Sequence, residues 1–388
     1  MCDSGDAAGG AMGIKGLTKL LHEHAPRCYK EQAIDSLFGR KIAIDASMAI
    51  YQFLIAVRQG ADQLTDSSGH TTSHIAGMFY RTIKLMEAGV KPVYVFDGKP
   101  PEFKSGELLK RREKAAEAQA ELKKATEAGD AELIEKMAKR TVRATKQDTE
   151  DVIKLLELMG VPVVRAESEA EATCAAMNKD GLVYGVGTED MDALTFGSVR
   201  QIRHLHKSDS QKLPIVEITL SFALEEMGIT MEQFIDICIL CGCDYTDSIR
   251  GIGPKKAFEH IKKYKNIETM LKYLDKTKYP IPEGSFNYEM ARKLFVEPEI
   301  TPRADIEGKL KWKPPDEEAL TKWMVEEKGF APERVASGIA RIKKSKSKGS
   351  QGRLDSFFKV TSSMPKRKPE MQKGKKGKKV KTGPYANR

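Results

Sequence analysis

The 388-residue sequence lacks several features that define large classes of protein. No apolar run approaches the roughly 20 residues that a membrane-spanning helix needs. The first eleven residues, MCDSGDAAGGA, have neither the basic start nor the apolar stretch of a secretory signal peptide. The six cysteines are irregularly spaced, which favours reduced thiols in an intracellular protein over a disulfide framework. These absences argue against a membrane-spanning protein and against a disulfide-stabilised secreted protein.

Three of the cysteines, Cys238, Cys241 and Cys243, have a C-x-x-C-x-C spacing that resembles a metal-binding motif. They lie in FIDICILCGC, an apolar helical pattern without a fourth ligand at metal-site spacing. The sequence therefore predicts core thiols here.

Positive charge is concentrated at the C-terminal end of the chain. Residues 341–388 hold 17 Lys and Arg but only two acids, Asp355 and Glu370, for a net charge of +15. The whole chain has 65 basic and 55 acidic side chains, which leaves 48 and 53 in residues 1–340, or −5. The basic tail is predicted to be disordered and attracted to polyanions.

Short apolar runs alternate with helical patterns in the first half of the chain. The runs predict strands, and the periodic patterns between them predict helices, of which the first is almost wholly apolar and expected to be buried. The strands are expected at 41–45, 92–97, 161–164 and 182–186, and the helices at 47–57, 75–83 and 152–159. This alternation predicts an α/β fold with a mostly parallel, twisted sheet and helices on both faces.

Two segments depart from that pattern. Residues 102–150 are rich in Ala, Glu, Lys and Arg, with Phe103 as the one aromatic residue, and predict long helices with little to bury. Composition alone favours a solvated helical hairpin there. Residues 265–340 alternate short helical pieces with Pro-rich joints, which is consistent with a wrap around the main body.

Acidic residues follow four successive predicted strands, and one more follows an apolar helix predicted at 231–241. They are Asp45, Asp97, Glu169, Glu171, Asp190, Asp192 and Asp244. The carboxyl ends of parallel strands share one edge of a sheet, where ligands bind. Mutual repulsion makes such a cluster costly without cations. Oxygen ligands without His or Cys select Mg²⁺ or Mn²⁺, and two such ions stabilise in-line attack at a phosphodiester.

The same residues permit other interpretations. Acids in the first turn of a helix interact favourably with its dipole, and Ser168 is a suitable cap, so AESEAEATCAAM by itself predicts only a helix start. Asp190 and Asp192 also have the Asp-x-Asp spacing of an aspartyl phosphatase. The distance of that pair from its strand disfavours phosphatase chemistry.

A glycine-rich turn precedes a helix predicted to begin near Pro254. Such a turn presents free N–H groups to a phosphate, and the lysines that follow add positive charge. The residues are Gly251, Gly253, Lys255 and Lys256, within RGIGPKKA. They predict either a simple turn or a helix–turn–helix hairpin that grips a duplex backbone without reading its sequence.

An apolar motif, QGRLDSFF, lies inside the basic tail. Its Q-x-x-L-x-x-F-F spacing indicates one helical turn that buries apolar groups in a partner's groove. Its key residues are Gln351, Leu354, Phe357 and Phe358.

Together these motifs resemble those of the eukaryotic flap endonucleases, within the structure-specific 5′ nuclease family. The resemblance spans about Met12 to Lys381 and includes MGIKGL, GRKIAIDASMAIYQFLIAVRQG, TTSHIAGMFYRT, KPVYVFDGKPPEFKSGEL, SEAEATCAA, TEDMDALTFG, GCDYTDSIRGIGPKKA and QGRLDSFF. The sequence departs from the family at Cys243, where Ser is frequent, and in the leader 1–11, which precedes the usual start.

The resemblance implies a Mg²⁺-dependent nuclease that cuts 5′ flaps and has 5′–3′ exonuclease activity. It implies roles in Okazaki fragment maturation and long-patch base excision repair. One Mg²⁺ would be surrounded by Asp45, Asp97, Glu169 and Glu171, and a second by Asp190, Asp192 and Asp244, with Mn²⁺ as a substitute. The residues implied to act in catalysis are Lys104, Arg111 and Asp192, the first two by polarising the scissile phosphate.

DNA contacts are implied as well, with Tyr51 stacking on a base near the cut. The matching positions are Tyr51, Arg58, Arg81, Glu169, Gly242, Asp244, Gly251, Gly253, Lys255 and Lys256. Besides flapped double-stranded DNA, the implied partner is the trimeric sliding clamp, proliferating cell nuclear antigen, bound through residues 350–358. The implied location is the nucleus (nucleolus and nucleoplasm), with the mitochondrion as a further candidate.

The resemblance also suggests how the chain is divided. We expect a disordered leader, two nuclease regions separated by an arch, a C-terminal wrap, a clamp-binding peptide and a basic tail. The bounds are 1–11, 12–115, 116–132 for the arch, 133–264, 265–345, 350–358 and 359–388. Because Asp3 and Asp6 would lie near a phosphate path, we expect the native protein to begin at Gly13.

Two other functions stay open at this point. A DNA-binding scaffold would use the tail to bind and keep its acids on the surface. A gap or Holliday-junction nuclease of the same superfamily would share the acids, although the clamp-binding motif argues against it.

Overall fold

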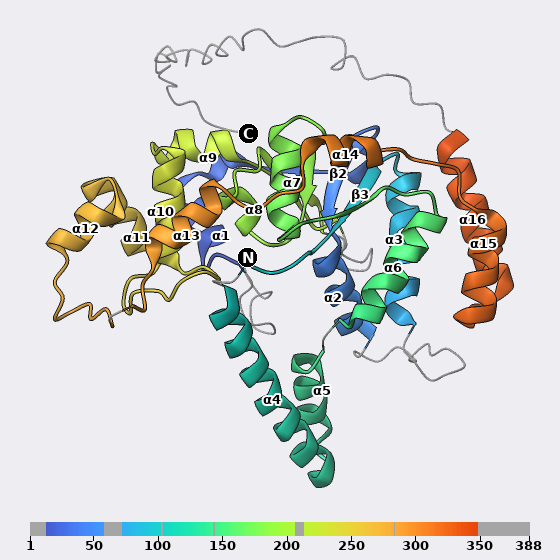
Figure 1. Cartoon of the computed structure of the whole chain (residues 1–388), viewed down its shortest axis with the longest axis horizontal. Coiled ribbons are helices and arrows are strands. Elements are labelled where there is room, and N and C mark those ends of the chain that lie inside the picture. The colour runs from blue at the N-terminus through green and yellow to red at the C-terminus, as the bar shows by residue number, and fades with distance from the viewer. Residues whose placement is uncertain are drawn as a thin grey trace, which may run out of the picture. The chain divides into compact units, whose positions relative to one another are not determined.

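The structure is a computed structural model that describes residues 13–57, 72–101, 104–142, 144–205, 213–282 and 284–347. The leader 1–11, Arg58, the clamp-binding motif 351–358 and the tail 359–388 lie outside these ranges. Helices cover both faces of a central sheet (Figure 1). Among the described helices there is none with the length and apolar character needed to cross a membrane.

The sheet has seven strands in the order β1-β7-β6-β5-β2-β3-β4. Their bounds are β1 Tyr29–Gln32, β2 Lys41–Asp45, β3 Lys91–Phe96, β4 Val163–Arg165, β5 Gly185–Gly187, β6 Arg200–Arg203 and β7 Ile215–Thr219. The five strands from β6 to β4 run parallel, whereas β7 pairs antiparallel with both β6 and β1. The prediction of a mostly parallel α/β sheet is confirmed.

The sheet differs from the prediction at one side. The strand expected at 182–186 is β5, which begins only at Gly185 and ends at Gly187. The sequence also gave no sign of β1 and β6, because YKEQ and RQIR have no apolar run. These strands form through backbone pairing with their neighbours, which is independent of side-chain hydrophobicity.

Alternate residues of the central strands face two different cores. Ile42 and Ile44 of β2 join the cluster that holds helices α2, α3 and α6, whereas Ala43 joins the cluster on α7. These helices span α2 Ala46–Val57, α3 Ser73–Glu87, α6 Lys146–Leu158, α7 Ala170–Lys179 and, after β5, α8 Asp192–Thr195. Burial on both faces explains why the central strands are apolar throughout.

The apolar helix α2 is less buried than expected. Ala49 and Ile50 are buried, but the side chains from Tyr51 to Leu54 are half-exposed. The expectation of a fully buried helix was wrong because one side of α2 lines the cavity described below.

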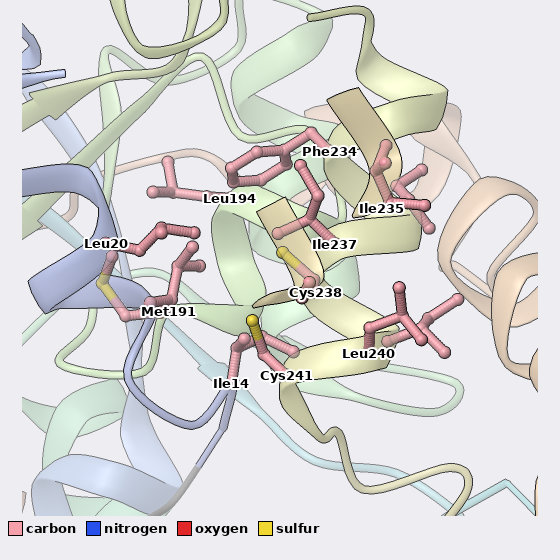
Figure 2. Packing of buried hydrophobic residues seen from close by; sticks show 14 of the residues in the cluster. Ile14, Leu20, Met191, Leu194, Phe234, Ile235, Ile237, Cys238, Leu240 and Cys241 are labelled. Carbon is pink, nitrogen blue, oxygen red and sulfur yellow. The ribbon is translucent and has the colours of Figure 1, made fainter. Parts of the chain in front are cut away.

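A second group of helices packs around α10 Met231–Cys241. The group comprises α1 Leu17–His24, α9 Leu220–Met227, α11 Pro254–Tyr264, α12 Ile267–Tyr273 and α13 Tyr288–Val296, with a short 3-10 turn at Pro26–Cys28. A second 3-10 turn, Ile34–Leu37, packs in the cluster of α2, α3 and α6 instead. Phe234, Ile237 and Cys238 of α10 point toward Leu194 and Leu20 in this core (Figure 2). Cys238 and Cys241 are buried among apolar side chains, so the prediction of core thiols is confirmed for these two. Cys243 follows α10 and is only partly buried against the same core.

The Ala- and Lys-rich segment forms a helical hairpin, α4 Ser105–Ala128 and α5 Ala131–Arg140, which projects from the sheet in Figure 1. Gly129 has φ 70° between the two helices, a conformation that glycine adopts without strain. Among the side chains of the hairpin that the structure describes, those of Ala118, Ala125 and Met137 are buried, which makes a thin core.

The last part of the described chain runs over β3 and β4. Trp312 Nε1 donates to the carbonyl of Pro92 at 3.0 Å, and Thr301 Oγ1 donates to that of Arg165 at 3.2 Å. The helices here are α14 Arg303–Lys309, α15 Glu317–Lys322 with a π-turn at Trp323–Glu327, and α16 Pro332–Ser347, which packs on α3.

Candidate active site

A cavity of about 340 Å³ lies where the parallel strands end. Six of the seven predicted acids line it, and so do three other predicted site residues. These lining residues are Asp45, Asp97, Glu169, Glu171, Asp190, Asp244, Lys104, Arg111 and Tyr51. The seventh acid, Asp192, is buried beside them, and its backbone N–H donates to Asp190 Oδ1 at 2.9 Å. The fold therefore brings the predicted acids together.

The strand ends position the first of these acids. Asp45 is the last residue of β2, and its Oδ1 accepts from the backbone N–H of Met48 at 3.1 Å. Asp97 follows β3 directly, and its Oδ1 accepts from the N–H of Ala170 at 2.9 Å. Asp97 thus satisfies the first turn of α7 from another strand.

This contact settles the simpler interpretation of AESEAEATCAAM. Glu169 occupies the N-cap position of α7, but its side chain makes no capping hydrogen bond. Ser168 is buried, and its Oγ has no hydrogen-bond partner. The expectation that Ser168 caps the helix was therefore wrong, and the carboxylate of Glu169 points to other partners.

Three side chains bind the carboxylates of Glu169 and Asp244. Lys104 Nζ donates to Glu169 Oε1 and lies 3.5 Å from Asp244 Oδ2. Arg111 Nη2 donates to Asp244 Oδ2 at 2.7 Å. The Tyr245 hydroxyl donates to Glu169 Oε2. Since Lys104 and Arg111 lie at the start of α4, the base of the hairpin contributes both cations to the cavity.

Tyr245 is the residue that sequence analysis missed. Its ring is buried beside Phe196 and Phe295, with centroids 6.5 Å and 5.0 Å away. Only its place directly after Asp244 in GCDY could have drawn attention to it. The packing fixes the hydroxyl where it orients one oxygen of Glu169.

Burial makes some of the carboxyl groups in this cavity hard to ionise, Asp45 and Glu171 among them. Burial and the charge of Asp97 raise the pKa of Asp45 to about 7. Burial, with repulsion from Asp45, raises the pKa of Glu171 well above its usual value. Burial alone would lower the pKa of Lys104, but the surrounding carboxylates outweigh it and raise that pKa. The cavity therefore favours positive charge.

The donor chemistry fits a hard divalent cation. The cluster offers carboxylate oxygens, and Asp192 Oδ1 is buried without a hydrogen-bond partner. As the side chains stand, no three His, Cys, Asp or Glu residues in the described ranges form a group that could hold an ion. The cationic groups of Lys104 and Arg111 instead lie against two of the acids.

The predicted DNA-contacting residues fall into separate places. Gly242 ends α10 with φ 110°, a backbone conformation that favours glycine. Gly253 is the N-cap of α11 and Pro254 its first residue, while Lys256 Nζ donates to the carbonyl of Gly251 at 2.8 Å. The predicted helix–turn–helix hairpin is thus present as α10 and α11. Arg81 lies on α3, outside the cavity lining.

Three features together define a structure-specific nuclease fold. They are the acidic edge of the sheet, the helical hairpin α4–α5 and the turn between α10 and α11. Residues 12–118 match the XPG N-terminal domain, and residues 160–244 match the XPG I-region. The chain is 55% identical over 374 residues to flap endonuclease 1 of Homo sapiens, covering 96% of this chain and 98% of that protein. It belongs to the flap endonuclease 1 family and is a nuclease, a hydrolase that cleaves DNA.

Solved structures agree with this fold. Flap endonuclease-1 from Methanococcus jannaschii is 33% identical with a TM-score of 0.63, over 82% of this chain and 96% of that one. The catalytic core of Rad2 in complex with DNA substrate is 25% identical with a TM-score of 0.64, over 85% of this chain and all of that one.

Proposed function

We propose that the carboxylate cavity hydrolyses a phosphodiester bond of DNA carrying a 5′ flap, with two Mg²⁺ ions, and that the same site degrades DNA 5′ to 3′. The observation that carries this proposal is the meeting of six carboxylates with Lys104 and Arg111 in one cavity. When bound, divalent ions would supply Lewis-acid stabilisation of the phosphate and a water of lowered pKa. Mn²⁺ prefers the same oxygen ligands as Mg²⁺ and would substitute for it.

The acids divide into two sets by their neighbours. Asp45, Asp97, Glu169 and Glu171 follow or face β2, β3 and β4, and we assign them to one ion. Asp190, Asp192 and Asp244 are assigned to the other, which is supported by the hydrogen bond between the first two and by their mutual repulsion. Crowding of carboxylates is unfavourable without a cation because their negative charges repel one another. Ligands of a metal ion, by contrast, must lie close together.

The cations of α4 act on the phosphate. Lys104 and Arg111 reach the cavity with their charged ends, so they can donate to a phosphate oxygen there and stabilise the charge that develops. Tyr51 lines the same cavity from α2 with a half-exposed ring, which suits stacking on a base beside the cleaved bond.

The α10–α11 turn holds the duplex away from the cut. The N-terminus of α11 has no side-chain cap, so its N–H groups are available to a backbone phosphate, and Lys255 lies beside them. We assign Gly242, Gly251, Gly253, Lys256, Arg81 and Arg58 to further backbone contacts, the last from outside the described residues. Binding of this kind is independent of sequence.

The cellular roles follow from this chemistry and from the tail. We propose that the protein removes flaps in Okazaki fragment maturation and long-patch base excision repair in the nucleus, with the mitochondrion as a second location. Residues 350–358, outside the described ranges, would dock on the trimeric sliding clamp. The Q-x-x-L-x-x-F-F spacing supports this assignment.

A substrate panel tests the proposal. The full chain is given a 5′-flapped duplex, a gapped duplex and a four-way junction, each with and without Mg²⁺, and Mg²⁺ binding is measured separately by calorimetry. We expect fastest cutting of the flap, only with the metal, and two bound ions. Binding of all three DNAs without cutting would favour the scaffold function, and preference for the junction would favour a resolving enzyme.

A further inference from the structure

Three aromatic side chains form a stacked row on α11 and α12, outside the site described above. The ring centroids of His260 and Tyr264 are 6.0 Å apart at 19°, and those of Tyr264 and Tyr273 are 5.5 Å apart at 10°. Tyr273, at the end of this aromatic row, is 70% exposed, more than the other large apolar side chains of the described ranges. One ring face therefore lies against Tyr264 while much of the ring remains accessible.

The backbone between the helices fixes this arrangement. Lys265 ends α11 with φ 74°, a left-handed conformation that is rare outside glycine. Asn266 then caps α12 by accepting from the N–H of Thr269 at 2.8 Å. The sharp turn brings α12 back along α11, where Ile267 is buried in the core. The row is thus pre-formed by the fold.

The surroundings of the row are strongly basic. Residues 254–278 contain eight lysines and three acids, a net charge of +5. One of the acids, Glu268, is engaged by Arg292 at 2.6 Å, and Lys263 Nζ lies 4.8 Å from the Tyr264 ring centroid. A polyanion that also has flat apolar groups is the complementary ligand.

We propose that the aromatic row is a stacking platform for an unpaired base of single-stranded DNA, with the neighbouring lysines holding its phosphates. An exposed ring accepts any base on its free face, which makes such binding tolerant of sequence. The proposal rests on the proposed function in that α11 begins at the turn assigned to the duplex, so a strand leaving that duplex can follow the helix to the row. An acidic protein segment is less suitable because its carboxylate side chains offer no flat ring to stack on the exposed face of Tyr273.

The test uses the full chain in metal-free buffer, with a blunt duplex and with the same duplex carrying a single-stranded extension that contains 2-aminopurine. The variant Tyr273→Leu removes the ring, Tyr273→Phe keeps it, and Phe222→Leu changes an aromatic side chain on α9 that is 46% exposed. Melting temperatures verify folding.

We expect wild type, Tyr273→Phe and Phe222→Leu to quench the fluorescence of 2-aminopurine, and Tyr273→Leu to lose the quenching. Affinity of Tyr273→Leu for the extended duplex should fall about tenfold relative to its affinity for the blunt duplex, within the range of base–aromatic stacking. Its salt dependence should be unchanged, whereas Lys272→Gln should reduce the slope by about one.

Equal quenching and equal affinity in wild type and Tyr273→Leu would overturn the proposal. A polyglutamate peptide whose binding depends on Tyr273, when DNA binding does not, would overturn it in favour of an acidic protein partner. The assignment of the α10–α11 turn to the duplex is tested separately. It fails if the double variant Lys255→Ala, Lys256→Ala binds the blunt duplex as tightly as wild type does, and this result does not depend on Tyr273.

Discussion

Replacing Asp192 by asparagine separates metal binding from folding in the cavity. Asp192 is 5% exposed, and its Oδ1 has no hydrogen-bond partner. Burial, followed by repulsion from Asp190 and Asp244, raises its pKa well above the usual value. The amide has the same shape and carries no charge, so it removes repulsion without leaving a void. In metal-free buffer at neutral pH we expect the variant to melt no lower than wild type.

Magnesium should reverse that order. An ion present at 100 times its Kd stabilises the folded state by about 2.7 kcal/mol. For a chain of this size that corresponds to a rise on the order of 5 °C in Tm. Changes to partners of metal ligands alone cost 10- to 100-fold in affinity, so loss of a ligand should remove most of this rise. Flap cleavage should fall by at least about a hundredfold.

Thermal melting with and without Mg²⁺, together with single-turnover cleavage of a flap, measures both effects. Asp236→Asn is the matched control. Asp236 is also a buried acid, 2% exposed, but it pairs with Arg292 at 2.7 Å and does not line the acidic cavity. It should lose about 1–3 kcal/mol of stability and keep the Mg²⁺ response. The reasoning is refuted if Asp192→Asn melts as low as this control without metal and still responds fully to Mg²⁺.

Three further outcomes follow from the structure. Tyr245→Phe keeps the buried ring but removes the hydrogen bond to Glu169, so calorimetry should show about 10- to 100-fold weaker Mg²⁺ binding; unchanged affinity would mean that the hydroxyl has no orienting role. The raised pKa of Asp45 means that the folded state binds more protons than the unfolded state, so the free energy of unfolding should fall as pH rises. Urea unfolding without metal between pH 5 and 7.5 should show a steeper fall in wild type than in Asp45→Asn. Equal slopes in the two proteins would contradict this. Gly338→Ala on α16 would place a methyl group against the ring of Phe79 on α3, and urea unfolding should show a loss of about 1–3 kcal/mol in stability. The control Gly308→Ala, whose methyl group would have nothing within 4 Å, should be neutral or stabilising. Similar values for both variants would show that α16 can shift to make room.

Local sequence patterns were sufficient to predict several strands and helices. The apolar run KIAID is strand β2 from Lys41 to Asp45, and the helix expected at 231–241 is α10 with the same bounds. The order of strands and helices then placed the acids at one edge, because parallel strands end on the same side. Local periodicity was sufficient for this part of the fold and for the acids of the cavity.

The contacts of those acids depend on tertiary packing. Lys104 meets Glu169 across 65 residues, and Arg111 meets Asp244 across 133. Asp97, rather than Ser168, satisfies the start of α7, although it lies 73 residues away. The edge strand β1, the inner strand β6 and the contact of the Tyr245 hydroxyl with Glu169 likewise have no local sequence signal. Such contacts depend on how the helices pack against the sheet. The hydrophobic periodicity of one segment indicates which face is buried, but it does not indicate which distant residue will form a hydrogen bond or ion pair with it.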